Sequence, residues 1–205
     1  MKHFEGWRTS ATEIPARRAG RFRLRHEQVE GLERPYWGLD GIDRCTVSGT
    51  LTYLTEGDIE WMVDDPARQR VMELYAQAAE GNVLVGGLGL GLLANALDGN
   101  PHVTDIFISE VSSEIRSLVP IPRRATLLET DFWEVATGWP GFTWHTIIAD
   151  LWDDRAAQRL DELHEEVALA AAAVRQEHPH AKLILHGFPA LSDYDPLKEG
   201  ASHPV

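Results

Sequence analysis

Short apolar runs alternate with amphipathic stretches through the second half of the chain. The runs predict buried strands over residues 83–85, 103–109, 125–128, 146–149 and 182–186. Apolar residues spaced three and four apart predict helices over residues 92–97, 112–119 and 160–174, and residues 133–141 are expected as a loop or short helix. Strands that alternate with helices are typical of a parallel sheet with right-handed crossovers. The pattern therefore predicts an α/β, Rossmann-like fold with about five parallel strands.

The first part of the chain has a different, β-rich pattern. Arginines alternate with Phe22 and Leu24, which predicts an exposed strand whose two apolar side chains turn inward. Residues 46–54 and 58–62 are expected to pair as a hairpin around the Glu56-Gly57 turn signal. A loop is expected between the strand around residues 21–25 and the strand over residues 46–54, because Pro35, Gly38 and Gly41 favour turns there.

A helix over residues 66–80 is expected to connect the two parts. Asp65 stands before Pro66 as an N-cap before an N1 residue, and Gly81 is expected to close the helix. We therefore expect an N-terminal extension with a β-hairpin over residues 1–65 and a Rossmann-like domain over residues 66–205. The polar tail from Pro189 onward is expected to be loosely held.

A cluster of glycines, Gly86-Gly-Leu-Gly-Leu-Gly91, follows the first strand of the second part. Glycine lets the backbone turn sharply, and it lets a ligand approach with no Cβ in the way. The helix expected after the turn presents free N–H groups and the positive end of its dipole. Strand, glycine turn and helix in this order open nucleotide-binding α/β domains.

Three further predicted strands end at or near an acidic residue: Glu110, Asp131 and Asp150. Because ligands of parallel sheets bind at the carboxyl ends of the strands, these acids are expected along one edge with the glycine turn. Glu110 follows Gly91 by 19 residues, and its carboxylate can accept hydrogen bonds from both hydroxyls of a ribose.

The other two acids suggest contacts to the rest of such a ligand. Asp131 can meet the exocyclic amine of an adenine, with Phe132 and Trp133 beside it to stack on the base; ordinary packing of the two rings is the open alternative. Asp150 is expected to point toward the reactive end of the ligand. Asp153 extends that rim, or else caps the next helix.

Four segments resemble the successive motifs of class I S-adenosylmethionine-dependent methyltransferases: residues 83–91, 108–112, 128–132 and 146–150. Within that superfamily the chain is most similar to the branch of spermidine synthase and guanidinoacetate methyltransferase. Members of that branch also place a hairpin or helix before the glycine loop. The resemblance covers about residues 50–188, and it implies a Rossmann-like domain with S-adenosylmethionine as its cofactor.

The resemblance also assigns roles to the matching residues. The glycines would hold the methionine part and ribose, Glu110 the ribose, Asp131 the adenine amine, and Asp150 the amino group or the acceptor. The expected cofactor-binding residues are Gly87, Gly89, Gly91, Glu110, Val111, Asp131, Phe132 and Asp150, and the expected catalytic residues are Asp150 and Asp153.

Departures from the family pattern leave the substrate open. Leu90 stands where aminopropyltransferases carry an Asp, and no Asn-Pro-Pro-Tyr follows the fourth strand. The final antiparallel strands of the family are also not predicted, which is compatible with an unusual activity on the same ligand or with a homodimer that completes the sheet. The alternatives therefore include lyase or cyclase chemistry on S-adenosylmethionine, an aminopropyltransferase-like enzyme, and an inactive ligand-binding domain.

Charge narrows the class of partner. The net charge is −13, residues 1–45 carry +2, and the remainder carries −15. Such acidity argues against the phosphate backbone of nucleic acid and is compatible with a cationic small substrate, although it also serves solubility. With no apolar stretch of about 20 residues and no leader pattern, we expect a cytoplasmic protein without a membrane partner. Cys45 is alone, and no metal site is expected.

The resemblance implies a methyltransferase that acts on a small acceptor, and the acidic charge is compatible with an amine-containing one. Methyl transfer needs little acid–base help, so the enzyme would act mainly by holding acceptor and methyl group in line. A second enzyme class, dinucleotide oxidoreduction, is suggested by Gly89-Leu-Gly-Leu-Leu-Ala94, which fits G-x-G-x-x-A. No candidate residues for hydride transfer accompany that motif.

Overall fold

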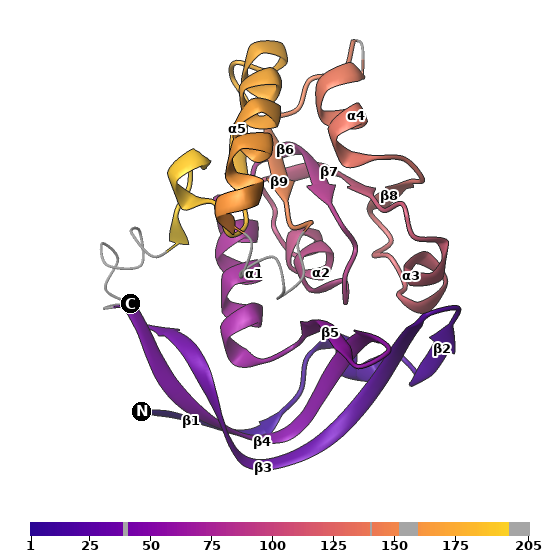
Figure 1. The fold of residues 1–205 in the computed structure, drawn as a ribbon, viewed down its shortest axis with the longest axis vertical. Helices are drawn as coiled ribbons and strands as arrows, with labels where there is room; N and C mark the ends of the chain where they lie inside the picture. Colours follow the sequence, from indigo (N-terminus) through magenta and orange to yellow (C-terminus); the bar gives the residue numbers. More distant parts are fainter. Residues whose placement is uncertain (39–40, 140, 152–159, 197–205) are drawn as a thin grey trace.

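Two β-sheets of different kinds make up the strands of the molecule (Figure 1). The computed structural model describes residues 1–38, 41–139, 141–151 and 160–196. Sheet A contains β1 (Lys2–Trp7), β2 (Arg17–Ala19), β3 (Phe22–Gly38), β4 (Gly41–Glu56) and β5 (Ile59–Val63). Sheet B contains β6 (Gly81–Gly86), β7 (Val103–Ser109), β8 (Ala125–Leu128), β9 (Thr146–Ala149) and β10 (Lys182–Leu185). The helices are η1 (Ser10–Glu13), α1 (Pro66–Ala78), α2 (Leu92–Asp98), α3 (Ser113–Leu118), α4 (Phe132–Gly138), α5 (Leu160–Glu177) and η3 (Pro189–Leu191).

Sheet B is fully parallel, with the strand order β10-β9-β6-β7-β8. This arrangement confirms the predicted α/β fold with five parallel strands. Successive residues of β6 serve opposite faces: Val83 and Val85 join the core formed with α1, α2 and α3, whereas Leu84 joins the core formed with α4 and α5. Because both faces of the central strands β6 and β9 are covered, their buried residues appear in the sequence as short apolar runs.

Sheet A is dominated by a long antiparallel hairpin of β3 and β4. The predicted pairing of β4 with β5 is confirmed, but the loop expected at Pro35, Gly38 and Gly41 is wrong. Pro35 and Gly38 belong to β3, and Gly41 opens β4. Proline is tolerated here because β2 pairs only with the first residues of β3, so Pro35 lies at the edge of the sheet.

Sheet A packs against the helices of sheet B, below α1, α2 and α3 in the view of Figure 1. Phe22 and Leu24 are each 1% exposed, which confirms their predicted inward orientation, and both join the same core as α1 and α2. Arg17 strengthens the contact, since its Nη2 donates to the carbonyl of Leu118 over 2.8 Å. The two sheets are therefore held by one continuous apolar core and by polar contacts at its rim.

The predicted helix after residue 65 is confirmed as α1. Asp65 caps it, because its Oδ1 accepts a hydrogen bond from the Arg68 amide over 2.9 Å. Its end differs from the prediction: Ala79 already has an extended backbone, and Gly81 opens β6. Asn100 satisfies the carbonyls of Ala76 and Ala79 at that end, so no glycine cap is needed.

The segment after β10 was predicted to be loosely held. In its described part, up to residue 196, it is instead held by hydrogen bonds to β10. The amide of Asp193 donates to the carbonyl of Leu183, and its Oδ2 accepts from the Leu183 amide, over 2.7 and 2.8 Å. Ser192 Oγ accepts from the Leu185 amide. These contacts satisfy donors and acceptors on the outer edge of β10 within one chain. In the described part of the chain, no helix combines the length and the apolar character that crossing a membrane requires.

Candidate functional site

A cavity of about 230 Å³ lies at the carboxyl edge of sheet B, and we name it the strand-end cavity. Sheet A closes it on one side. The lining residues are Arg21, Phe22, Leu54, Trp61, Met62, Gly87, Gly89, Ser109, Glu110, Val111, Ser112, Ile115, Asp131, Phe132, Asp150 and Leu151. The structure therefore brings together the predicted residues of the four strand ends that follow β6, β7, β8 and β9. Asp153 lies outside the described residues.

The glycine turn after β6 requires its glycines for geometric reasons. Gly87 has a φ of +87°, and a Cβ there would lie 2.6 Å from the carbonyl oxygen of Asp150. Gly89 has a φ of +52°, and a Cβ there would lie 2.8 Å from the Sδ of Met62. Gly91 does not line the cavity; it is the left-handed N-cap of α2. Gly87 and Gly89 therefore form the wall, while Gly91 starts the helix behind it.

Glu110 joins the glycine turn to the turn after β7. Its Oε2 accepts a hydrogen bond from the Leu88 amide over 3.0 Å, and its Oε1 accepts from the Ser112 amide over 2.8 Å. The side chain is buried, yet each carboxylate oxygen has a second lone pair beyond these bonds. The carboxylate can therefore hold the loop and still accept hydrogen bonds from a ligand.

Asp131 has a similar double use. Its Oδ1 caps α4 by accepting from the amides of Trp133 and Glu134, over 2.8 and 3.2 Å. The cap leaves Oδ2 unused, and the residue is exposed on the cavity wall. Phe132 beside it is buried and packs edge-on against Trp133, with ring centroids 4.8 Å apart. This part of the cavity wall therefore combines the apolar ring of Phe132 with the carboxylate of Asp131.

Asp150 is the least satisfied of the three acids. Its side chain is only 7% exposed, and its Oδ1 makes no hydrogen bond within the described ranges. Its ion-pair neighbour among the described residues is Arg68 of α1, whose Nη1 lies 3.6 Å from that oxygen. This distance permits charge attraction but is too long for a hydrogen bond. A buried carboxylate oxygen in this state is an acceptor to which a ligand can donate.

Arg68 belongs to a network that the sequence did not reveal. Its Nη1 lies 2.8 Å from Nε2 of His186, and Nδ1 of that ring lies 3.1 Å from the hydroxyl of Tyr75. Because a guanidinium only donates, Nε2 must accept, which places the ring proton on Nδ1 and leaves His186 neutral. Burial, and secondly the Asp150 carboxylate, raises the pKa of Tyr75 above its ordinary value, so its hydroxyl keeps its proton.

The residues missed at sequence level fall into two groups. The first group is Arg21, from the turn before β3, and Leu54, from β4, because sheet A reaches the cavity only through long-range strand pairing. His186, in contrast, directly follows β10, so the same rule that selected Glu110 and Asp150 applies to it. A search of every strand end for titratable side chains would have found it.

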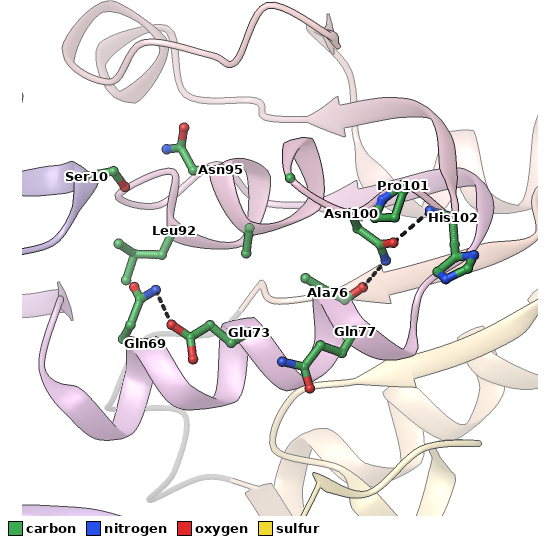
Figure 2. Close-up of a pocket in the computed structure, with 12 residues that line it drawn as sticks. Ser10, Gln69, Glu73, Ala76, Gln77, Leu92, Asn95, Asn100, Pro101 and His102 are labelled. Carbon is green, nitrogen blue, oxygen red and sulfur yellow. Dashed lines mark hydrogen bonds between the residues drawn. The ribbon is translucent and has the colours of Figure 1, made fainter. Parts of the chain in front are cut away.

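A larger cavity of about 550 Å³ lies between α1 and α2, away from these strand ends. Figure 2 shows Gln69, Glu73 and Gln77 along α1, with Asn95 and Asn100 across from them. Much of this polarity is internally satisfied: Gln69 Nε2 donates to Glu73, and Asn100 bridges the end of α1 and the amide of His102. None of the predicted site residues lines it, so its size alone does not make it the better candidate.

Comparison with known proteins adds no family to this description: no protein-family model matches the sequence, and no curated protein matches it.

Proposed function

We propose that the chain is an S-adenosylmethionine-dependent methyltransferase that acts on a small, amine-type acceptor. The observation that carries the proposal is the meeting of Gly87, Glu110, Asp131 and Asp150, from four successive strand ends, around one cavity. These are the positions that the resemblance of the sequence to class I methyltransferases assigns to the cofactor. A buried carboxylate, an apolar ring wall and a glycine turn supply the chemistry that a nucleoside with a charged amino-acid tail requires.

Each wall suits one part of that ligand. The free lone pairs of Glu110 can accept the ribose hydroxyls, and Phe132 with the Oδ2 of Asp131 can receive the adenine ring and its amine. The positive φ of Gly87 brings bare backbone to the surface where the methionine part would lie. The unpartnered Oδ1 of Asp150 can accept from an ammonium or amine N–H.

The cavity must enlarge to take the whole ligand, because about 230 Å³ is below the roughly 300–1,000 Å³ of typical small-molecule pockets. Met62 is the side chain positioned to move. Its Sδ lies 3.2 Å from the Leu90 amide, directly over the glycine turn. Methionine has three rotatable bonds and adapts readily, so its displacement would free both space and a backbone donor.

Bound S-adenosylmethionine would supply an electrophilic methyl group on a sulfonium that leaves readily. The contribution of the chain is then to orient the acceptor and to exclude water. Asp150 can hold an acceptor N–H along the line of attack and take up its proton. Trp61 and Phe22, whose rings pack edge-on at 5.4 Å, cover this region from sheet A.

The first test is a calorimetric titration with S-adenosylmethionine, S-adenosylhomocysteine and NAD. The proposal expects saturable binding of both adenosyl ligands and none of NAD. Binding of NAD alone would favour dinucleotide oxidoreduction, the alternative interpretation of the glycine motif. Consumption of S-adenosylmethionine by the protein without any acceptor would indicate lyase or cyclase chemistry instead.

The Asp131→Asn substitution locates the ligand within the cavity. Asparagine caps helices as well as aspartate does, so α4 should persist. The new amide, however, would face the donating amine of adenine, and we expect roughly tenfold weaker binding of S-adenosylmethionine from the lost hydrogen bond. Asp65→Asn is the matched control, because Asp65 caps α1 in the same way outside the strand-end cavity. Equal affinity in both variants would remove Asp131 from the adenine site.

A further inference from the structure

The cavity of about 550 Å³ between α1 and α2 is large enough for a small molecule, and we name it the helix cavity. Its volume falls within the roughly 300–1,000 Å³ of typical small-molecule pockets. Among the described residues, it shares no lining residue with the strand-end cavity. A ligand bound here would therefore be a separate one. The polar lining residues are Ser10, Gln69, Glu73, Gln77, Asn95, Asn100 and His102.

Gln69 is oriented so that its carbonyl oxygen is left without a donor. Its Nε2 donates to Oε1 of Glu73 over 2.9 Å, as Figure 2 shows. Because an ionised carboxylate only accepts, the amide cannot be turned the other way, and Gln69 Oε1 must face away from Glu73. That oxygen is buried and has no hydrogen-bond partner in the described part of the chain. A buried carbonyl oxygen in this state requires a donor.

The two asparagines of the helix cavity also use their donors within the chain. Asn95 Nδ2 donates to the carbonyl of Gly91 over 2.8 Å, which leaves Oδ1 to accept from other groups, and the residue is exposed. Asn100 Nδ2 donates to two carbonyls at the end of α1. The internal hydrogen bonds of this wall thus consume amide N–H groups, while oxygens of Gln69 and Asn95 remain as acceptors.

Glu73 adds a negative charge to these acceptors. Arg70 on the same helix approaches Oε2 of Glu73 only to 3.9 Å, beyond hydrogen-bond distance. The two side chains are 35% and 43% exposed, so solvent screens the pair and it is weak. No Lys or Arg is among the described residues that line the cavity. The wall therefore favours a ligand that is positively charged and donates hydrogen bonds.

We propose that the helix cavity binds a small alkylammonium ion. An ammonium group carries three N–H donors and no acceptor, which complements this wall. Gln69 Oε1 would accept one N–H, and the carboxylate of Glu73 would balance the charge. An anion would instead be repelled by Glu73. A short alkyl chain would lie on the apolar lining residues, which are Ala76, Leu92, Ala96 and Pro101.

The position of the helix cavity separates this ligand from the acceptor of the proposed reaction. Asp150, which would orient that acceptor, lines the strand-end cavity. Asn95 lies one turn into α2 and is bonded to Gly91, the N-cap that follows the glycine turn. An amine at the helix cavity would therefore bind on the outer side of the helix that begins at that turn. Its binding does not depend on the proposed function.

Butylammonium is a suitable probe, with butanol and butyrate as its neutral and anionic counterparts of similar chain length. In ¹H–¹⁵N spectra of the full chain at constant ionic strength, the side-chain NH₂ resonances of Gln69 and Asn95 should shift saturably with butylammonium and with neither counterpart. Gln69→Leu should weaken butylammonium binding about tenfold, because a hydrogen bond to a charged group is lost. Glu73→Gln should weaken it about fivefold, because a partly exposed charge is lost.

Both variants should fold, because Leu and Gln are good helix formers and Leu removes the unsatisfied carbonyl. Glu165→Gln is the matched control for the change in charge. Glu165 is exposed on α5, which packs on the other face of sheet B, so its substitution should leave butylammonium affinity unchanged.

The outcomes separate this site from the proposed reaction. Weaker butylammonium binding in Gln69→Leu and Glu73→Gln, but not in Glu165→Gln, would support the helix cavity even if S-adenosylmethionine does not bind. Equal binding of butanol, or unchanged butylammonium affinity in the first two variants, would overturn it. Shifts confined to the indole N–H of Trp61, which lines the strand-end cavity, would place the amine there and overturn the second site as well.

Discussion

On the β7 and β8 side of the strand-end cavity, Glu110 and Asp131 accept hydrogen bonds from backbone amides of adjoining turns. On the β9 side, Asp150 faces a guanidinium 3.6 Å away and keeps an oxygen with no hydrogen bond in the described part of the chain. Backbone donors are fixed by the fold, whereas Arg68 on a helix can exchange one partner for another. The comparison teaches that the carboxylates on the first side are held in place by backbone amides, whereas the carboxylate on the second side keeps a buried oxygen open to a donor.

The largest expected effect comes from breaking the glycine turn that joins the two sides. Gly87→Ala would force an L side chain into positive φ and place its Cβ against the carbonyl oxygen of Asp150, so we expect a loss of at least about 2 kcal/mol in unfolding free energy. Denaturant unfolding measures this loss. Binding of S-adenosylmethionine should disappear with it.

Gly99→Ala provides the comparison for that variant. Gly99 has a φ of −81°, and the nearest atom to an added Cβ is 3.6 Å away. This substitution should leave stability and binding nearly unchanged. A Gly99→Ala variant as unstable as Gly87→Ala would show that the turn after β6 has no special requirement for glycine.

The next effect tests the backbone-held side directly. In Glu110→Gln, one oxygen keeps its amide donor, but the new NH₂ group must face the other backbone N–H. We expect a destabilisation of about 1–3 kcal/mol from that unsatisfied buried donor. Thermal unfolding should show it, and Glu114→Gln on neighbouring α3 is the control. Unchanged stability would mean that Glu110 does not hold the glycine turn.

The smallest effect concerns charge at the start of α1, on the Arg68 side. Burial raises the pKa of Asp64 from 3.8, outweighing its hydrogen bonds from the Thr52 amide and the Thr9 hydroxyl. The folded state therefore favours the protonated acid: this contribution to stability is complete below the ordinary pKa and is lost as the pH rises through the raised one.

The Asp64→Asn substitution tests this direction of the pH dependence of stability. Asparagine can accept from the Thr52 amide and donate to Thr9, so the fold should persist. The difference in unfolding free energy between wild type and variant should favour the wild type more at low pH than at neutral pH. Denaturant midpoints measured across that range report it. A difference that does not change with pH would contradict the raised pKa.

The prediction of sheet B from sequence rests most firmly on the strands that are buried on both faces, such as β9, in which all four residues are buried. Strands β7, β8 and β9 match the predicted ranges residue for residue. The predicted strand ends also placed Glu110, Asp131 and Asp150 correctly at one edge of the sheet, because the carboxyl ends of parallel strands lie on the same side. Sheet A was harder: the alternation identified β4 and β5, but the pairing of β3 with β4 depends on residues far apart in the chain.

What the sequence determined by itself was therefore local: the order of strands and helices, the glycine turn, and the acids that follow the strands. Only the tertiary structure decided that Met62 lies over the glycine turn and that Gln69 and Asn95 line one cavity. It also decided which acids accept hydrogen bonds from backbone amides and which one faces a guanidinium instead. Periodicity reports which face of an element is buried, but the partner of a side chain is set by how distant elements pack.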